Sequence, residues 1–131
     1  MPDGIRRVST GSPFETTIGY SRAVAVDGWA FVAGTTGYDY ASMTMPDAIE
    51  DQCRNALGTI AAALAELGGG LSDVVRVRYI VTDATAWPAC WPVLAEAFGE
   101  TRPAATMIVA GLQEPEMKIE IEVTARVPAK G

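Results

Sequence analysis

The chain has 131 residues, of which 49% are hydrophobic and 20% charged, so residues 1–131 should form a single domain with a core of its own. Ten Lys and Arg stand against 16 Asp and Glu, and the formal net charge of −6 repels nucleic acid and anionic lipid surfaces. The absence of His removes the commonest general base and the commonest metal ligand, which excludes a Ser–His–Asp triad and argues against a metal site.

The first third of the sequence predicts three strands. Residues 5–10 form a short strand, and a loop then runs from Gly11 to Tyr20. Residues 22–26 and 29–35 read as a hairpin, because they flank Asp27-Gly28, a dipeptide typical of two-residue hairpin turns.

A helix is predicted over residues 47–67, since apolar side chains recur at helical spacing on one face. These are Ile49, Cys53, Ala56, Leu57, Ile60, Leu64 and Leu67. Thr44 is a candidate N-cap and Pro46 suits the first turn. The run of glycines that begins at Gly68 supplies the left-handed residue that commonly ends a helix.

The remaining sequence predicts a strand, a helix and two more strands. Residues 73–82 alternate, with Val75, Val77, Tyr79 and Val81 on one face and Val74, Arg76, Arg78 and Ile80 on the other. A second, shorter helix is indicated by the apolar residues Trp87, Trp91, Leu94, Ala95 and Phe98. Its first residue is not defined, because Pro88 and Pro92 lie near its start and a proline inside a helix loses a backbone hydrogen bond. Strands over residues 104–112 and 118–127 complete the chain.

The order β-β-β-α-β-α-β-β predicts an α+β fold in which two helices cover one face of one mixed sheet. In the last strand Ile119, Ile121, Val123, Ala125 and Val127 suit the covered face, and the alternate residues face away. On that second face Arg76 and Arg78 can pair with Glu120 and Glu122. The face is either solvated or closed by other copies of the chain, and the apolar Val74 and Ile80 among the charges favour the homo-oligomer.

Two residues stand out as candidates for chemistry. Glu120 projects from a strand between apolar residues, so partial burial would raise its pKa and suit it to proton transfer. Spacing alone favours the alternative, in which Glu120 is a structural partner of Arg76 or Arg78. Gly34 ends a strand, where it either lets a ligand approach the backbone or marks a bulge. The sequence contains no GxxxxGK[ST] or GxGxxG nucleotide-binding loop.

The two cysteines, Cys53 and Cys90, lie among apolar residues and are expected to be core residues rather than nucleophiles. Two thiols without a disulfide framework suit a reducing cytoplasm. The first residues lack the apolar run of a signal peptide, and no stretch reaches the length of a membrane span, so we expect a soluble cytoplasmic protein.

The chain contains four informative runs in order: Tyr20-Ser21-Arg22-Ala23-Val24, Val32-Ala33-Gly34-Thr35, Arg102-Pro103-Ala104-Ala105-Thr106 and Lys118-Ile119-Glu120-Ile121-Glu122. Together they resemble the Rid (YjgF) family of reactive-intermediate deaminases over nearly the whole chain. The resemblance implies a chorismate-mutase-like fold and a homotrimer whose sheets surround a central barrel. It also implies clefts between subunits, where enzyme members of the family hydrolyse enamines and imines without a cofactor.

By this resemblance Glu120 is the catalytic residue that positions water, and Tyr20 and Gly34 bind the substrate. The strand residues Ala105, Thr106 and Met107 join them in the substrate-binding set. Ala105 occupies the position of the arginine that grips a substrate carboxylate in the family, and a methyl group cannot make that contact. Arg22 is a candidate replacement cation. Arg102 lies three positions before Ala105, and an odd spacing along a strand places two side chains on opposite faces. Arg102 should therefore point away from the site.

The resemblance therefore implies a protein that handles a small carboxylate or imine-like metabolite. The first hypothesis is a deaminase whose ligand differs from that of the family because of Ala105. Two alternatives remain at this point: a non-catalytic trimeric ligand-binding or regulatory module, and an endoribonuclease. The acidic charge and the absence of His disfavour the endoribonuclease.

Overall fold

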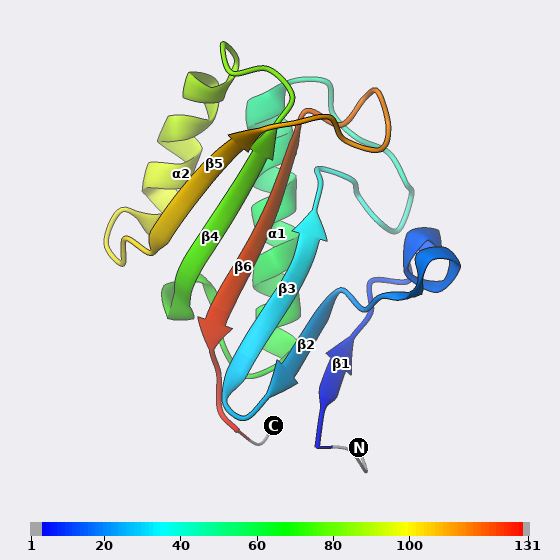
Figure 1. Ribbon diagram of the computed structural model, residues 1–131, viewed down its shortest axis with the longest axis vertical. Coiled ribbons are helices and arrows are strands. Elements are labelled where there is room, and N and C mark those ends of the chain that lie inside the picture. The colour runs from blue at the N-terminus through cyan, green and yellow to red at the C-terminus, as the bar shows by residue number, and fades with distance from the viewer. Residues whose placement is uncertain (1–3, 130–131) are drawn as a thin grey trace.

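The structure, a computed structural model, describes residues 4–129 and consists of a mixed sheet backed by two helices (Figure 1). Its principal elements are β1 (Arg6–Val8), β2 (Ala23–Val26), β3 (Trp29–Thr35), α1 (Ile49–Glu66), β4 (Val74–Val81), α2 (Trp91–Phe98), β5 (Ala104–Val109) and β6 (Ile119–Arg126). The strands lie side by side in the order β1-β2-β3-β6-β4-β5, and only β4 and β5 among these neighbours run parallel. Both helices lie behind the sheet in Figure 1, which leaves its opposite face open. The predicted fold class and element order are confirmed.

The N-terminal hairpin forms as its sequence predicts. Asp27 and Gly28 both have positive φ, 54° and 82°, which is the backbone geometry that a tight two-residue turn requires. The first strand is shorter than predicted, because only Arg6–Val8 pairs with β2. The loop that follows contains a π-helical turn over Glu15–Gly19, which the sequence pattern does not reveal.

Helix α1 begins two residues later than predicted and ends where the glycines predict. Its N-cap is Ala48, which makes no side-chain cap, so the prediction of Thr44 as the cap is wrong. Thr44 instead forms an isolated bridge with Asp39. Gly68 has φ +86°, the left-handed conformation expected just past a helix end.

A β-bulge changes the alternation at the start of β4. Val74 aligns with Ala125 and Arg76 with Thr124, so Val75 is an extra residue on this strand. Val74 is consequently buried and Val75 is 43% exposed, the reverse of the faces predicted for these two residues. From Arg76 onward the alternation is as predicted, with Val77, Tyr79 and Val81 buried.

The two prolines of the second helical segment each begin a helical element. Pro88 lies in the first turn of a 3-10 helix, Trp87–Cys90, and Pro92 lies in the first turn of α2. A proline is tolerated there because the N–H groups of a first turn have no partner within the helix. The break between the two elements explains why the start of this helix could not be fixed from sequence.

Strand β5 is an exposed edge of the sheet. All six of its residues, Ala104–Val109, are exposed, and Met107, Ile108 and Val109 are large apolar side chains among them. The strand is shorter than the predicted range of 104–112. Arg102 precedes it with positive φ and donates a hydrogen bond from Nε to the carbonyl of Gly99 at 3.2 Å, so it caps the end of α2 and has no strand face.

Both cysteines are fully buried, as predicted. They contact each other where α1 meets the 3-10 segment before α2, and the hydrogen bond with Cys90 together with burial raises the pKa of the Cys53 thiol. The same hydrogen bond lowers the pKa of the Cys90 thiol, but both side chains are shielded from solvent, so the pair serves as core packing. Across residues 4–129 no helix is long and apolar enough to cross a membrane.

Candidate functional site

Glu120 and Gly34 meet at a bulge between β3 and β6. Val32 aligns with Val123 and Thr35 with Ile121, so Ala33 and Gly34 together face one residue of β6. The Glu120 side chain lies against Gly34: a Cβ built there would collide with its Oε1 and lie 2.6 Å from its Cδ. Gly34 therefore marks a bulge, as one of its two interpretations predicts, and it also makes room for the Glu120 carboxylate, while the approach of a ligand to its backbone stays a prediction.

A pocket of about 250 Å³ opens at this bulge. Four segments line it: the turn before β2 (Phe14, Ile18, Tyr20), the end of β3 (Ala33, Gly34, Thr36), the loop after β3 (Tyr40), and the chain leading into β6 (Gln113, Met117, Glu120). The structure thus brings together three of the predicted site residues, Glu120, Tyr20 and Gly34. The lining of the pocket combines apolar side chains with converging polar groups, and concave sites that combine the two commonly bind small molecules.

The electrostatic environment raises the pKa of Glu120 above its ordinary value of 4.5. Burial is the largest cause, the like charge of Glu122 adds to it, and the positive charge of Arg22 opposes it. A carboxyl group with a raised pKa, placed in a pocket, is better suited to accept and return a proton than an ordinary surface carboxylate.

Gln52 on α1 holds the loops that carry Tyr40 and Met117. It is fully buried, donates from Nε2 to the carbonyls of Pro46 and Glu116 at 2.9 Å, and accepts from the backbone N–H of Lys118 at 2.9 Å. Tyr38 adds a hydrogen bond from its hydroxyl to Glu116 at 2.7 Å. These bonds fix the mouth of the pocket to the rigid helix, although Gln52 itself does not line it.

Arg22 lies behind the pocket rather than in its lining. It precedes β2, and its side chain is fully buried. Its Nη2 donates to the Tyr20 hydroxyl at 3.1 Å, and Tyr20 lines the pocket. Arg22 is therefore placed beside the site that the sequence predicts, one layer behind the surface that a ligand would touch.

Ala105, Thr106 and Met107 do not line this pocket in the single chain. They lie on β5, and β4 separates that strand from β6, which carries Glu120. Thr106 aligns with Arg78, and its hydroxyl is 3.4 Å from Nη2 of Arg76. Their predicted part in the site thus depends on contact with another copy of the chain.

Sequence reasoning missed the other lining residues, which are Phe14, Ile18, Ala33, Thr36, Tyr40, Gln113 and Met117. Phe14 and Ile18 reach the pocket only because the chain makes a π-helical turn, for which no pattern was visible. Tyr40 carried a weak signal, since it is one of two aromatic residues in the polar loop after β3.

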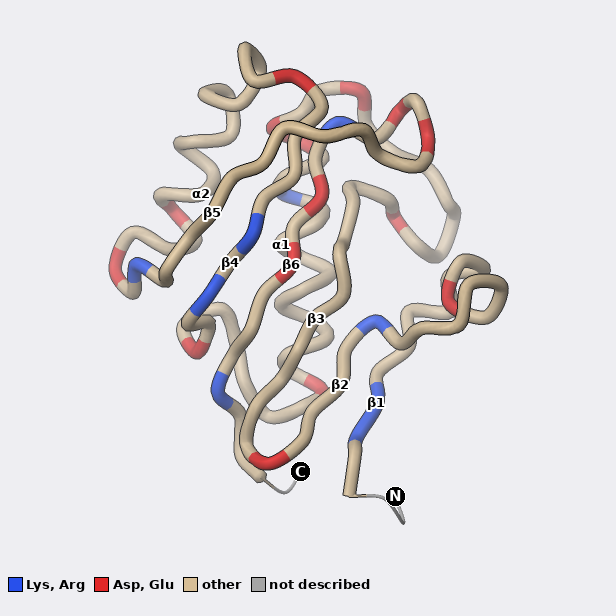
Figure 2. The backbone as a smooth tube through the Cα atoms, in the orientation of Figure 1, with Lys and Arg blue, Asp and Glu red and all other residues tan. Residues whose placement is uncertain are grey.

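The open face of the sheet carries charges of both signs, and Figure 2 shows basic positions along β4 beside acidic positions along β6. Arg78 pairs with Glu122 at 2.7 Å, as predicted, and Arg76 contacts Thr106. Both partners of the ion pair are more than a third exposed, so it is worth only about 0–1 kcal/mol in the single chain. Phe31 and Ile108, 48% and 39% exposed, add apolar surface to this face and its edge.

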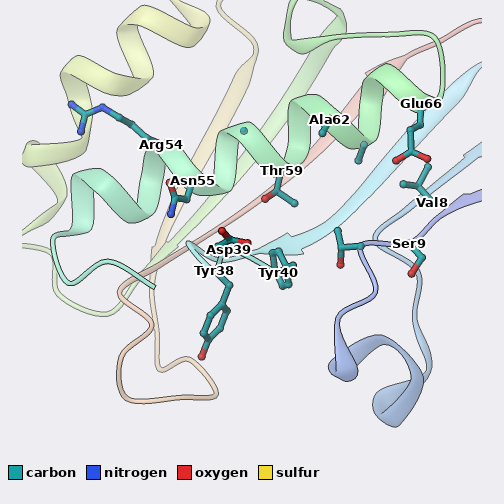
Figure 3. Close-up of a pocket in the computed structure, with 13 residues that line it drawn as sticks. Val8, Ser9, Tyr38, Asp39, Tyr40, Arg54, Asn55, Thr59, Ala62 and Glu66 are labelled. Atoms are coloured by element: carbon teal, nitrogen blue, oxygen red, sulfur yellow. The ribbon is translucent and has the colours of Figure 1, made fainter. Parts of the chain in front are cut away.

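A larger hollow of about 500 Å³ lies between α1 and the segments around Val8 and Tyr40 (Figure 3). Its charged side chains, Asp39, Arg54 and Glu66, are exposed, and Arg54 already pairs with Asp51 at 2.7 Å. The smaller pocket at Glu120 is therefore the better candidate site.

Comparison with known proteins identifies relatives along nearly the whole chain. The sequence profile of the family described as endoribonuclease L-PSP matches residues 10–127. An uncharacterized protein of Streptomyces coelicolor is 32% identical over 124 residues, which cover 94% of this chain and 92% of that protein. A RutC family protein of Pyrococcus horikoshii is 32% identical over 107 residues, covering 81% and 85%.

Solved structures agree with these relatives. A member of the YjgF/YER057c/UK114 family from Mycobacterium tuberculosis superposes with a TM-score of 0.86 at 43% identity, covering 94% of this chain and 99% of that chain. RidA from an Antarctic Psychrobacter gives a TM-score of 0.78 at 25% identity, covering 83% and 89%.

Proposed function

The chain belongs to the endoribonuclease L-PSP family, which includes the YjgF and Rid proteins, and on this premise we propose that it hydrolyses a small imine or enamine at the Glu120 pocket. The observation that supports this most strongly is a half-buried carboxyl group of raised pKa on the wall of a pocket of small-molecule size. The alternative is a non-catalytic module that binds the same class of ligand.

In the proposed reaction an enamine first tautomerises to the imine. Glu120 accepts a proton from a water molecule as the water oxygen attacks the C=N carbon, and it returns this proton to the nitrogen, which gives a carbinolamine. The carbinolamine hydroxyl then passes its proton by way of Glu120 to the amino nitrogen, the C–N bond breaks, and a ketone and ammonia leave. Gly34 leaves the carboxylate free to face the pocket, and Tyr20, which also lines the pocket, supplies a hydroxyl group. The scheme needs no metal and no cofactor.

We further propose that three copies of the chain close the open face of the sheet. Strand β5 leaves an unpaired edge with exposed apolar side chains, and a bare edge of this kind is normally covered. Closure would also bring Ala105, Thr106 and Met107 of one copy to the pocket of another, as the family resemblance implies. Because Ala105 offers no charge, the ligand must be held differently from that of members with an arginine there.

Hydrolysis is tested with 2-aminoacrylate generated in solution, while the formation of pyruvate and ammonia is followed. We expect the protein to accelerate their release above the uncatalysed rate. Binding of pyruvate without any acceleration would favour the binding module, and the absence of both would contradict the proposal. An RNA oligonucleotide serves as a second substrate, and the net charge of −6 predicts that it is neither bound nor cleaved.

The assembly is tested by sedimentation. The wild-type protein is expected to sediment as three chains of 13.8 kDa, whereas Ile108→Glu should sediment as one chain, because a charge on this face cannot be buried unpaired. Ala62→Glu, at an exposed position of α1, is the matched control and should remain assembled. A wild-type protein that sediments as one chain at micromolar concentration would contradict the trimer.

A further inference from the structure

Arg22 is a fully buried cation held directly behind the pocket. Its Nη1 donates to the carbonyl of Gly34 at 2.9 Å and to Oγ1 of Thr35 at 3.1 Å, and its Nη2 donates to the Tyr20 hydroxyl at 3.1 Å. The guanidinium carbon also lies 5.3 Å from the centre of the Tyr20 ring and 4.8 Å from that of Tyr40. Two walls of the pocket, Tyr20 and Gly34, are thus hydrogen-bonded to one positive charge.

This charge has no anionic partner in direct contact within residues 4–129. The ion pairs found there do not include Arg22, and its Nε is buried without a hydrogen-bond partner. Glu120 and Glu15 feel its charge at longer range only. Burying a cation is costly unless a negative charge compensates it, so an anion bound in the pocket would offset part of the free-energy cost of burying Arg22.

The hydrogen bond from Arg22 also orients the Tyr20 hydroxyl. A phenol has a single O–H donor and accepts through its lone pairs, and Arg22 occupies one of the acceptor sites. The Tyr20 proton must therefore point away from the guanidinium, and Tyr20 lines the pocket. A donor polarised by a neighbouring cation is a strong partner for a carboxylate oxygen.

An ionised Glu120 alone would repel an anionic ligand from this pocket, and the alanine at position 105 supplies no counter-charge. We propose that Arg22, acting through the Tyr20 hydroxyl, is the positioning residue that makes the pocket prefer a small carboxylate over a neutral ligand of the same shape. The proposal rests on the proposed function for the location of the site, but it concerns binding and not hydrolysis.

Titration calorimetry with pyruvate and with pyruvamide compares an anion with a neutral ligand of nearly equal size. The wild-type protein should bind pyruvate at least about tenfold more tightly, as expected for a charge-assisted hydrogen bond in a partly buried site. In Arg22→Gln the two affinities should become nearly equal, while the affinity for pyruvamide changes little. Arg22→Lys, which keeps the charge, should restore part of the preference.

Tyr20→Phe separates this relay from a purely structural role of Arg22, because Tyr20 is partly exposed and its ring is retained. It should also abolish the preference, and Arg22→Gln combined with Tyr20→Phe should lose no more than either change alone. Thermal melting checks that each variant is folded, and Tyr20→Phe decides the matter should Arg22→Gln fail to fold.

A wild-type protein without a preference for pyruvate, or a preference that survives Tyr20→Phe, would overturn the proposal. Pyruvate cannot be deaminated, so these results are independent of turnover. A preference for pyruvate that depends on Arg22, without hydrolysis of 2-aminoacrylate, would refute the proposed function alone. Hydrolysis together with a preference that is unchanged by substitution of Arg22 and of Tyr20 would refute this inference alone.

Discussion

Glu120→Gln is expected to lower the rate of imine hydrolysis by at least about a hundredfold, because an amide cannot accept a proton from water. The substitution keeps the shape of the side chain against Gly34, so pyruvate binding should persist. The measurement is kcat/KM for pyruvate formation. Activity that survives Glu120→Gln would show that the proton acceptor lies elsewhere.

The raised pKa of Glu120 fixes the sign of two pH effects. The carboxylate must be ionised to act as a base, so the rate should fall as pH drops through a pKa that lies above 4.5. A raised folded-state pKa also means that the protonated form favours folding, and this contribution is lost as pH rises through that pKa. Glu120→Gln should therefore raise the melting temperature at neutral pH and change it little below pH 4.5.

Glu122→Gln is the matched control. Glu122 lies two residues along the same strand, pairs with Arg78 and does not line the pocket. It contributes to the raised pKa of Glu120, so its removal should shift the acidic limb of the rate profile to lower pH while turnover at neutral pH remains.

Gly34→Ala is expected to abolish most activity without unfolding the protein. The new methyl group would occupy the place of the Glu120 carboxylate, whose Cδ would lie 2.6 Å away. The carboxylate is the end of a flexible side chain, so it can move aside and the fold survives, but a displaced base costs roughly a hundredfold in rate.

Gly58→Ala, on α1, provides the comparison for Gly34→Ala. A Cβ at Gly58 meets nothing within 4 Å, and alanine favours the helix, so this variant should gain about 0.5–1 kcal/mol of stability with unchanged activity. Kinetics and chemical denaturation of both variants test the pair of expectations. Full activity in Gly34→Ala would mean that the carboxylate does not act from its place in the structure.

The elements of the fold follow from periodicity and turn chemistry, which are local properties of the sequence. Asp27-Gly28 fixed the hairpin, the apolar spacing from Ile49 to Leu64 fixed α1, and alternation fixed β6. The errors arose where backbone irregularity overrides periodicity. The bulge at Val75 reversed two side chains of β4, and Arg102 adopts a helix-capping conformation that a strand pattern cannot anticipate.

The candidate site was only partly predictable for the same reason. Glu120, Tyr20 and Gly34 could be named from the residue pattern and the family resemblance, and they meet in one pocket. The position of Arg22 behind that pocket depends on tertiary packing against Tyr20 and Tyr40, which spacing along the chain does not encode.

The bare edge at β5 has a consequence for the lifetime of the newly made chain. In a single chain this edge can pair with any extended segment that diffuses to it, including one from a chain that is still being synthesised. On the trimer proposal, association of subunits competes with such mispairing, and the rate of association rises with the concentration of the protein. Dilution would then destabilise the folded protein, whereas a high concentration in the cell would protect new chains from mispairing.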